Sequence, residues 1–188
     1  MLHKGMSRSQ VEEILNQKGD FVQIDYLTRF LREELSLDMK KYSYIKLAEI
    51  YEKMGMFDNA TKMLDNAVLV SLTYPEKIKF HLKEAELYIR MGSFENADKA
   101  IRKATSYSNV GQRAEIFFQL KEFYLNQARI YEKELKRNNA SKIYERLLQM
   151  RLNSDDEKAI KAKLLGLYAK LGKFKEMDLL KRGLNKKN

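Results

Sequence analysis

The chain has 188 residues, of which 44% are apolar and 33% are charged, a balance that favours a folded protein over a disordered one. It contains no cysteine, which excludes disulfides, thiolate metal sites and cysteine nucleophiles. The net charge of +10 favours acidic partners such as RNA, ribosomes, an acidic peptide or an anionic membrane face, although lysines also serve simply to solvate exposed helices.

The composition predicts a nearly all-helical protein. There is one proline in the whole chain, and the strong helix formers Lys, Glu, Leu and Ala are abundant. No apolar run is long enough to cross a membrane, and the N-terminal stretch MLHKGMSRSQ has no apolar core of the kind that a secretory signal needs. We therefore expect no membrane span and a cytoplasmic location.

A degenerate first repeat is expected over residues 7–36. Gly19 and Phe21 form a glycine-x-phenylalanine signature that returns further along the chain. Apolar residues flank this signature at helical spacing, namely Val11, Leu15, Ile24, Leu27 and Leu31. The alanines of the later copies are absent, as is expected of a terminal repeat that packs on one side only.

Two clear repeats follow over residues 41–72 and 75–108. The stretch MGMFDNA at 54–60 returns as MGSFENA at 91–97. Gly55 and Gly92 come where a helix must stop, because glycine can take the left-handed conformation that closes it. Apolar residues before and after each glycine recur at spacings of three and four, which mark one face of a helix. The expected unit is a helix, a tight turn and an antiparallel helix.

Two weaker copies are expected over residues 114–152 and 155–184. The first of them has no turn glycine, and Asn138 and Asn139 in the stretch LKRNNA are expected to supply the turn. Its first helix is expected from about residue 114 to residue 136, after a loop near SYSNVGQ. The last copy has the turn glycine Gly172, but larger apolar residues replace the alanines. A basic C-terminal end covers residues 181–188.

The order of residues in each unit resembles the tetratricopeptide repeat family, whose unit of about 34 residues carries an aromatic, a small residue, a tyrosine, a turn glycine, an aromatic and two alanines. In the second copy His81 stands where the first aromatic belongs, and Glu84 stands where a leucine belongs. Because the units are longer than the family norm, the helical repeats of SNAP-type adaptors are a variant of the same interpretation. The residues of the first copy that match are Tyr44, Leu47, Ala48, Tyr51, Gly55, Phe57, Ala60 and Ala67.

This resemblance implies an all-α fold, a right-handed α-solenoid of about five antiparallel helix pairs. Each pair cannot bury its own apolar face, so the pairs stack into one continuous core. The first helices of the pairs are then expected to line a concave groove. The groove residues expected to bind a partner are Tyr42, Ile45, Lys46, Glu49, Lys79, Leu82, Lys83, Glu86, Arg90, Arg129, Lys133 and Lys163. Ile45 and Glu49 occupy the positions where some family members carry a lysine–asparagine clamp for a C-terminal carboxylate, so that clamp is not expected here.

The sequence gives no sign of catalysis. It has no phosphate-binding glycine loop, and its neighbouring carboxylates point apart on a helix. The two histidines, His3 and His81, are far apart in the chain, and His81 takes the place of a packing aromatic. We therefore expect no enzyme activity, no catalytic residue, no cofactor and no metal site.

The expected function is a protein–protein interaction adaptor or scaffold that binds an acidic or amphipathic protein segment in the concave groove. The alternative is an RNA- or ribosome-associated protein that uses its basic helices and C-terminal tail, since residues 170–188 carry seven basic and two acidic residues. The last helix has an apolar stripe and no predicted repeat after it, which leaves room for a homodimer through that helix. The stripe consists of Phe174, Met177, Leu180 and Leu184.

Overall fold

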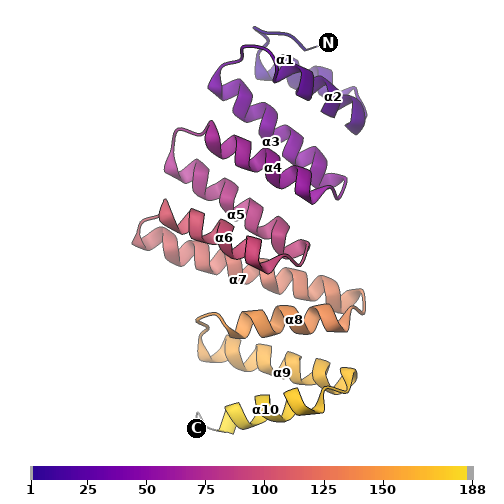
Figure 1. Ribbon diagram of the computed structural model, residues 1–188, viewed down its shortest axis with the longest axis vertical. Coiled ribbons are helices and arrows are strands. Elements are labelled where there is room, and N and C mark those ends of the chain that lie inside the picture. The colour runs from indigo at the N-terminus through magenta and orange to yellow at the C-terminus, as the bar shows by residue number, and fades with distance from the viewer. Residues whose placement is uncertain (1, 186–188) are drawn as a thin grey trace. The chain divides into compact units, whose positions relative to one another are not determined.

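Ten helices form the computed structural model over the residues that it describes, 2–185, and no strand occurs among them (Figure 1). Consecutive helices form antiparallel pairs joined by short turns, which confirms the all-α prediction and the helix-turn-helix unit. The handedness of the array stays a prediction. The helices are α1 (Arg8–Asn16), α2 (Asp20–Phe30), α3 (Leu37–Lys53), α4 (Phe57–Leu69), α5 (Tyr74–Arg90), α6 (Phe94–Ser106), α7 (Val110–Lys133), α8 (Arg137–Leu148), α9 (Ser154–Leu171) and α10 (Phe174–Asn185).

Polar side chains cap the starts of several first helices of the pairs. The Ser7 hydroxyl accepts a hydrogen bond from the backbone N–H of Gln10, and the Gln10 side chain accepts one from the Ser7 backbone. Ser36, Thr73 and Asn153 cap α3, α5 and α9 in the same way through their side-chain oxygens. Each cap satisfies one of the backbone donors that a helix start leaves free. These caps fix where the first helices begin.

In the pairs α3–α4, α5–α6, α7–α8 and α9–α10, the turn between the two helices contains one residue with a positive φ, whereas Gly19 between α1 and α2 has φ −68°. Gly55, Gly92 and Gly172 have φ values of 74°, 72° and 69°, as the glycine pattern predicted. Between α7 and α8 that residue is Leu135, with φ 57°. The prediction that Asn138 and Asn139 make this turn is wrong, because α8 begins at Arg137 and both asparagines lie inside it.

Helix α7 begins earlier than the sequence predicted, at Val110 rather than near residue 114. The reason is a second reciprocal cap. The Asn109 side chain accepts from the backbone N–H of Gln112 at 2.9 Å, and the Gln112 side chain accepts from the backbone N–H of Asn109 at 3.0 Å. The spacing N-x-x-Q was present in the sequence as a start signal, and it places the boundary four residues before the expected one.

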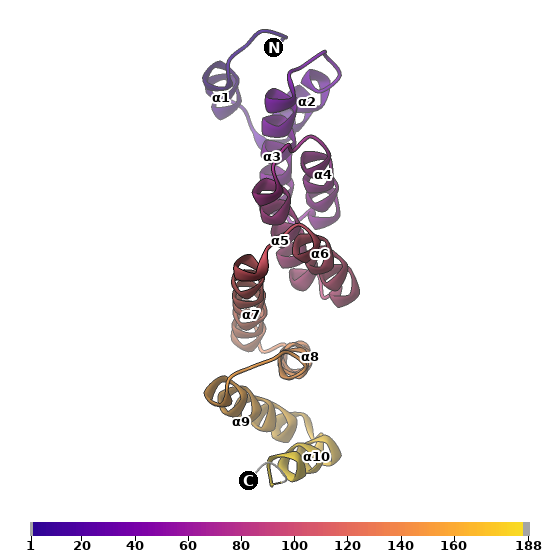
Figure 2. The same ribbon diagram turned by 90° about the vertical axis from the view of Figure 1, so that its left-hand side faces the viewer.

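The chain divides into two compact units, Met1–Ile116 and Phe117–Asn188, and the boundary lies inside α7. In the first unit α4 packs against both α3 and α5, and α5 also packs against α6. Figure 2 shows α3 and α5 on one side of this unit and α4 and α6 on the other. The small residues Ala60 and Ala97 on the second helices are fully buried, which lets neighbouring helices approach closely.

In the second unit, residues 117–188, α9 packs against both α8 and α10. The core contains Tyr124, Ile143, Leu147 and Leu164, all nearly inaccessible to solvent. On α10, Phe174 is exposed, so part of the expected apolar stripe faces solvent. Leu184 and the end of the basic segment 181–188 lie outside the described side chains, and the homodimer through α10 stays a prediction.

Among residues 2–185, no helix combines the length and the apolarity that crossing a bilayer requires.

Candidate functional site

In the first unit, ion pairs join α1 to α3 on the face where the first helices meet. The Lys46 Nζ lies 3.5 Å from a carboxylate oxygen of Glu12 and 3.9 Å from one of Glu49. The Arg8 guanidinium lies over the ring of Tyr42, 5.6 Å from its centroid. Three predicted groove residues, Lys46, Glu49 and Tyr42, therefore meet here. The charge of Lys46 is already matched by two carboxylates of the same unit.

A denser set of ion pairs joins α3 to α5. Glu52 accepts hydrogen bonds from Lys83 Nζ at 2.9 Å and from Arg90 Nη1 at 2.6 Å. Lys83 also donates to Glu86 at 2.9 Å, and the Arg90 guanidinium lies 4.5 Å from the centroid of the Phe57 ring. Burial lowers the pKa of Lys83, but the carboxylates of Glu52 and Glu86 outweigh burial and hold that pKa above its usual value. Lys83, Glu86 and Arg90 are among the residues expected from the sequence, whereas Glu52, which accepts hydrogen bonds from Lys83 and Arg90, is not.

Not every predicted groove residue of the first unit is accessible. Leu82 is only 6% exposed, so it belongs to the core and not to an open surface. The cause is that α4 and α6 both pack against α5, which buries eight of its 17 residues. Ile45 is half-buried, and Lys79 is exposed. The hydroxyl oxygen of Tyr42 is buried without a hydrogen-bond partner, and burial raises the pKa of this phenol.

In the second unit, the three predicted residues Arg129, Lys133 and Lys163 are exposed. Arg129 donates a hydrogen bond to the side chain of Asn126 at 2.8 Å. Because asparagine is uncharged, this contact does not neutralise the guanidinium. Lys163 on α9 lies 3.3 Å from a carboxylate oxygen of Glu132 on α7. This face thus has a single interhelical ion pair among these residues, with exposed cations beside it.

A hollow of about 360 Å³ lies beside this ion pair. Its floor on α9 consists of small residues at spacings of three and four, Ala159, Ala162 and Gly166, which lie on one helix face. A Cβ placed on Gly166 would meet no other atom within 4 Å, so the space above this glycine is open. The complete lining is Glu132, Ala159, Ala162, Lys163, Gly166, Leu167 and Lys170.

The two units differ sharply in charge. The first unit contains 18 basic and 17 acidic residues, and the second contains 18 basic and nine acidic residues. Nearly all of the net charge of +10 therefore belongs to residues 117–188. The net positive charge that favours acidic partners is therefore a property of the second unit.

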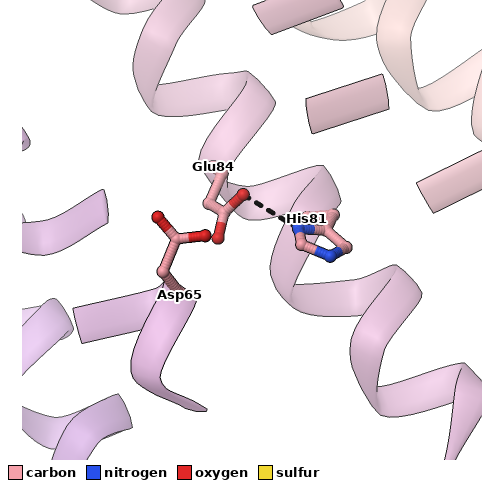
Figure 3. Close-up of side chains that lie close together, drawn as sticks. All are labelled: Asp65, His81 and Glu84. Atoms are coloured by element: carbon pink, nitrogen blue, oxygen red, sulfur yellow. Dashed lines mark hydrogen bonds and ion pairs between the residues drawn. The ribbon is translucent and has the colours of Figure 1, made fainter. Parts of the chain in front are cut away.

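A cluster of ionisable side chains lies between α4 and α5 of the first unit (Figure 3). The Nδ1 of His81 and an oxygen of Glu84 are 2.9 Å apart, and both side chains are almost fully buried. The carboxylate of Asp65 on α4 points toward that of Glu84. The second oxygen of Glu84 is buried with no hydrogen-bond partner, and burial raises the pKa of this carboxyl group despite the opposing effect of His81.

Comparison with known families finds matches in the first unit. Residues 42–73 and 78–110 each match the family model of the tetratricopeptide repeat. Residues 42–110 carry two tetratricopeptide repeats. The first repeat corresponds to α3 and α4, and the second to α5 and α6. The matched ranges overlap the repeats predicted at 41–72 and 75–108. The division of the whole chain into five repeats stays a prediction.

Comparison with solved structures finds matches of low sequence identity. A putative kinesin light chain with nearly identical tetratricopeptide-like repeats from Podosopora anserina is 18% identical, with a TM-score of 0.47, over 97% of this chain and 94% of that one. Its Q17M variant is 16% identical, with a TM-score of 0.45, over 94% and 90%. BtubC (BKLC) from P. vanneervenii is 18% identical, with a TM-score of 0.42, over 91% and 72%. No curated protein matches the sequence. The repeat assignment rests on the family matches rather than on these structures.

Tetratricopeptide repeats indicate a protein–protein interaction scaffold in general, and the fold is typically non-catalytic. The His81–Glu84 pair belongs to the second tetratricopeptide repeat, and Asp65 belongs to the first. The cluster thus joins one repeat to the next. His81 was expected to pack as an aromatic residue, and its contact with Glu84 and its proximity to Asp65 were not predicted.

Proposed function

We propose that the chain is a non-catalytic scaffold that binds an acidic, amphipathic protein segment on the first helices of the second unit, α7 and α9. One observation carries the proposal: the hollow above Ala159, Ala162 and Gly166 lies beside exposed lysines. A large apolar side chain of the partner would enter the hollow. Acidic side chains on either side of it would contact the cations around the rim.

The size and lining of the hollow support an apolar anchor. Its volume falls in the range of about 300–1,000 Å³ that is usual for ligand pockets. The short side chains of Ala159 and Ala162, and the lack of one on Gly166, leave the α9 backbone close to the surface, and Leu167 adds an apolar wall. Anchor residues in such depressions commonly contribute most of the free energy of a protein interface.

The charge distribution supports the acidic character of the partner. Lys133 and Lys170 are exposed on α7 and α9, and the second unit has twice as many basic as acidic residues. In the first unit, Lys46, Lys83 and Arg90 are already bound to carboxylates of neighbouring helices. A partner carboxylate would have to displace those pairs, so we place the acidic contacts on the second unit.

The excess of nine positive charges in the second unit also favours one other candidate, binding to RNA. Phosphates neutralised by lysines release counterions, so such binding weakens steeply as salt rises. A segment held by an apolar anchor weakens much less. Salt dependence therefore separates the two candidates.

The test is affinity capture of the tagged chain from its own cells, in nuclease-treated and untreated halves, with protein and RNA both identified. Two variants are run beside the wild type. Ala162→Phe fills the hollow, and Ala169→Phe adds the same side chain at another exposed position of α9 that does not line it. We expect a protein that survives nuclease to be captured by the wild type and by Ala169→Phe but lost with Ala162→Phe.

Two results would overturn this proposal. If Ala162→Phe captures the same protein as the wild type, the hollow is not the binding site. If ribosomal proteins and RNA dominate and disappear with nuclease, the RNA-associated function replaces the scaffold.

A further inference from the structure

Two residues of the second tetratricopeptide repeat depart from the repeat pattern, and they depart together. His81 and Glu84 take the places that Tyr44 and Leu47 have in the first repeat, 37 residues earlier. Leu47 is 2% exposed and Glu84 is also 2% exposed, so an apolar core residue in one repeat is matched by a buried carboxylate in the other. A buried carboxylate is costly unless a partner compensates its charge.

The partners present in the cluster do not satisfy Glu84 fully. One oxygen lies 2.9 Å from His81 Nδ1, and the other oxygen is buried with no hydrogen-bond partner. Asp65 brings a second carboxylate to the same place, and one ligand atom from each of the three side chains lies within 4.8 Å of the others. Two carboxylates this close repel each other, and either protonation of one of them or a cation beside both removes that repulsion.

We propose that Asp65, His81 and Glu84 form a binding site for a divalent transition-metal ion of the Zn²⁺ class. One imidazole nitrogen and two carboxylate oxygens are ligands that suit Zn²⁺ or Co²⁺ better than Mg²⁺ or Ca²⁺, which prefer oxygen alone. A water molecule would complete four-coordination. Glu84 follows His81 by three residues on α5, so both side chains lie on one helix face.

The site has room to close and a path to solvent. Tetrahedral ligands at the usual Zn²⁺ distances are about 3.4 Å apart. The 2.9 Å between His81 Nδ1 and Glu84 would therefore open slightly. Asp65, whose oxygen lies within 4.8 Å of the other two ligand atoms, would move in by about an ångström. Asp65 can make that movement because 48% of its side chain is exposed. On the other side of the histidine, the ring of Tyr107 stacks on His81 with 5.9 Å between centroids and holds the plane of the imidazole.

Lys103 on α6 is the present competitor for the ion. Its Nζ lies 3.4 Å from a carboxylate oxygen of Asp65, and 55% of its side chain is exposed. A bound divalent ion would displace this ammonium group into solvent. Because Asp65 comes from the first tetratricopeptide repeat and the other two ligands come from the second, the ion would fasten one repeat to the next.

The experiment is a titration of the metal-free full chain with Co²⁺, followed by visible absorption, and with Zn²⁺, followed by the thermal melting midpoint. We expect one Co²⁺ per chain with the absorption bands of a low-coordinate site, and a higher melting midpoint with Zn²⁺ but not with Mg²⁺. Asp65→Asn should weaken Co²⁺ binding at least about tenfold. This variant changes a half-exposed side chain, so it should fold.

Two control variants sharpen the test. Glu86→Gln removes a carboxylate from the same helix outside the cluster, and it should leave Co²⁺ affinity unchanged. Lys103→Gln removes the competing cation, and it should raise Co²⁺ affinity. The proposal is overturned if the wild type gives no Co²⁺ bands, if Asp65→Asn binds Co²⁺ as tightly as the wild type, or if Mg²⁺ raises the melting midpoint as much as Zn²⁺.

Discussion

The two units of the chain have the same number of basic residues but different numbers of acidic residues to balance them. In the first unit, cations such as Lys83 and Arg90 meet carboxylates of a neighbouring first helix, and the unit is nearly neutral. In the second unit, acidic residues are half as many, and Lys133 and Lys170 are exposed. The comparison teaches that a net charge describes a partner surface only after the internal ion pairs have been assigned.

The units do share one arrangement. Lys41 on α3 lies 2.5 Å from Glu76, the third residue of α5, and Lys121 on α7 lies 2.7 Å from Asp156, the third residue of α9. In both places a lysine of one first helix reaches an acid in the first turn of the next first helix. An acid at a helix start also interacts favourably with the helix dipole. This pair is therefore structural in both units.

The largest expected difference between the units concerns packing. Ala97→Leu forces a larger side chain into the closed core of the first unit and should cost about 1–3 kcal/mol of unfolding free energy. Ala162→Leu places the same side chain over the hollow of the second unit and should change that free energy by less than about 0.5 kcal/mol. Urea unfolding followed by circular dichroism measures both. An unchanged midpoint for Ala97→Leu would contradict the register of the repeats.

The turns should respond in opposite directions. Leu135 holds a left-handed conformation that costs a non-glycine residue about 1–2 kcal/mol, and its side chain is 72% exposed. Leu135→Gly should therefore stabilise the second unit by about 0.5–1 kcal/mol, after the greater freedom of glycine in the unfolded chain is allowed for. Gly92→Ala should destabilise the first unit by about 1 kcal/mol. If both variants shift the urea midpoint in the same direction, the turn assignment fails.

A smaller effect is expected from the shared lysine–acid pair. The hydrogen bond from Lys41 holds the pKa of Glu76 below its ordinary value of 4.5. A lowered pKa in the folded state stabilises the protein above the ordinary value, and that stability is lost as the pH falls through the lowered value. Glu76→Gln should cost about 0.5 kcal/mol at neutral pH, and the difference from wild type should vanish in acid.

The control for this prediction is Lys41→Met, which should reduce the same pH-dependent stability without changing the carboxylate, while the hydrogen bonds from Thr73 keep part of it. Chemical denaturation at several pH values measures both variants. A Glu76→Gln difference that persists unchanged in acid would show that the side chain acts through packing and not through its charge.

The smallest expected effect is the response to salt. Self-repulsion among 18 basic and nine acidic residues should be screened as ionic strength rises, so the second unit should gain a few tenths of a kcal/mol. The nearly neutral first unit should stay the same or lose slightly as its ion pairs are screened. Hydrogen exchange followed by mass spectrometry reports the two units separately. Equal changes in protection in both units would contradict the charge division.

The periodic features of the sequence predicted most of the fold. Apolar residues at spacings of three and four gave the helices, and Gly55, Gly92 and Gly172 gave three turns because only glycine takes the left-handed conformation at little cost. The positive φ of Leu135 could not be predicted from the sequence, because leucine rarely adopts a positive φ. The start of α7 could have been predicted, because the sequence contains the capping pair Asn109 and Gln112, which was not recognised as a helix start.

The candidate surfaces were harder to predict because their partners lie far apart in sequence. Glu52 meets Lys83 and Arg90, which are 31 and 38 residues away, and helical periodicity alone does not say which carboxylate of α3 they reach. Leu82 was predicted to face the groove because the pattern assumes that a helix has one buried face. Both α4 and α6 pack against α5, so α5 has a wider buried surface that includes Leu82. His81 and Glu84 were visible as departures from the repeat pattern, but Asp65 on another helix was not.

Glu52 of the first repeat has no acidic counterpart in the second repeat, where Ile89 takes its position. This difference helps to keep neighbouring repeats from exchanging places. Two hairpins that match the same family model are alike enough to invite domain swapping, a common failure of repeat proteins. If the second repeat occupied the place of the first, its own Lys83 and Arg90 would lose Glu52, which belongs to the first repeat. Pro75 would then stand in the place from which Asp38 pairs with Arg8. Both misplacements leave cations without a counter-charge, so the ion pairs of the first unit make the native order of its hairpins the favoured one.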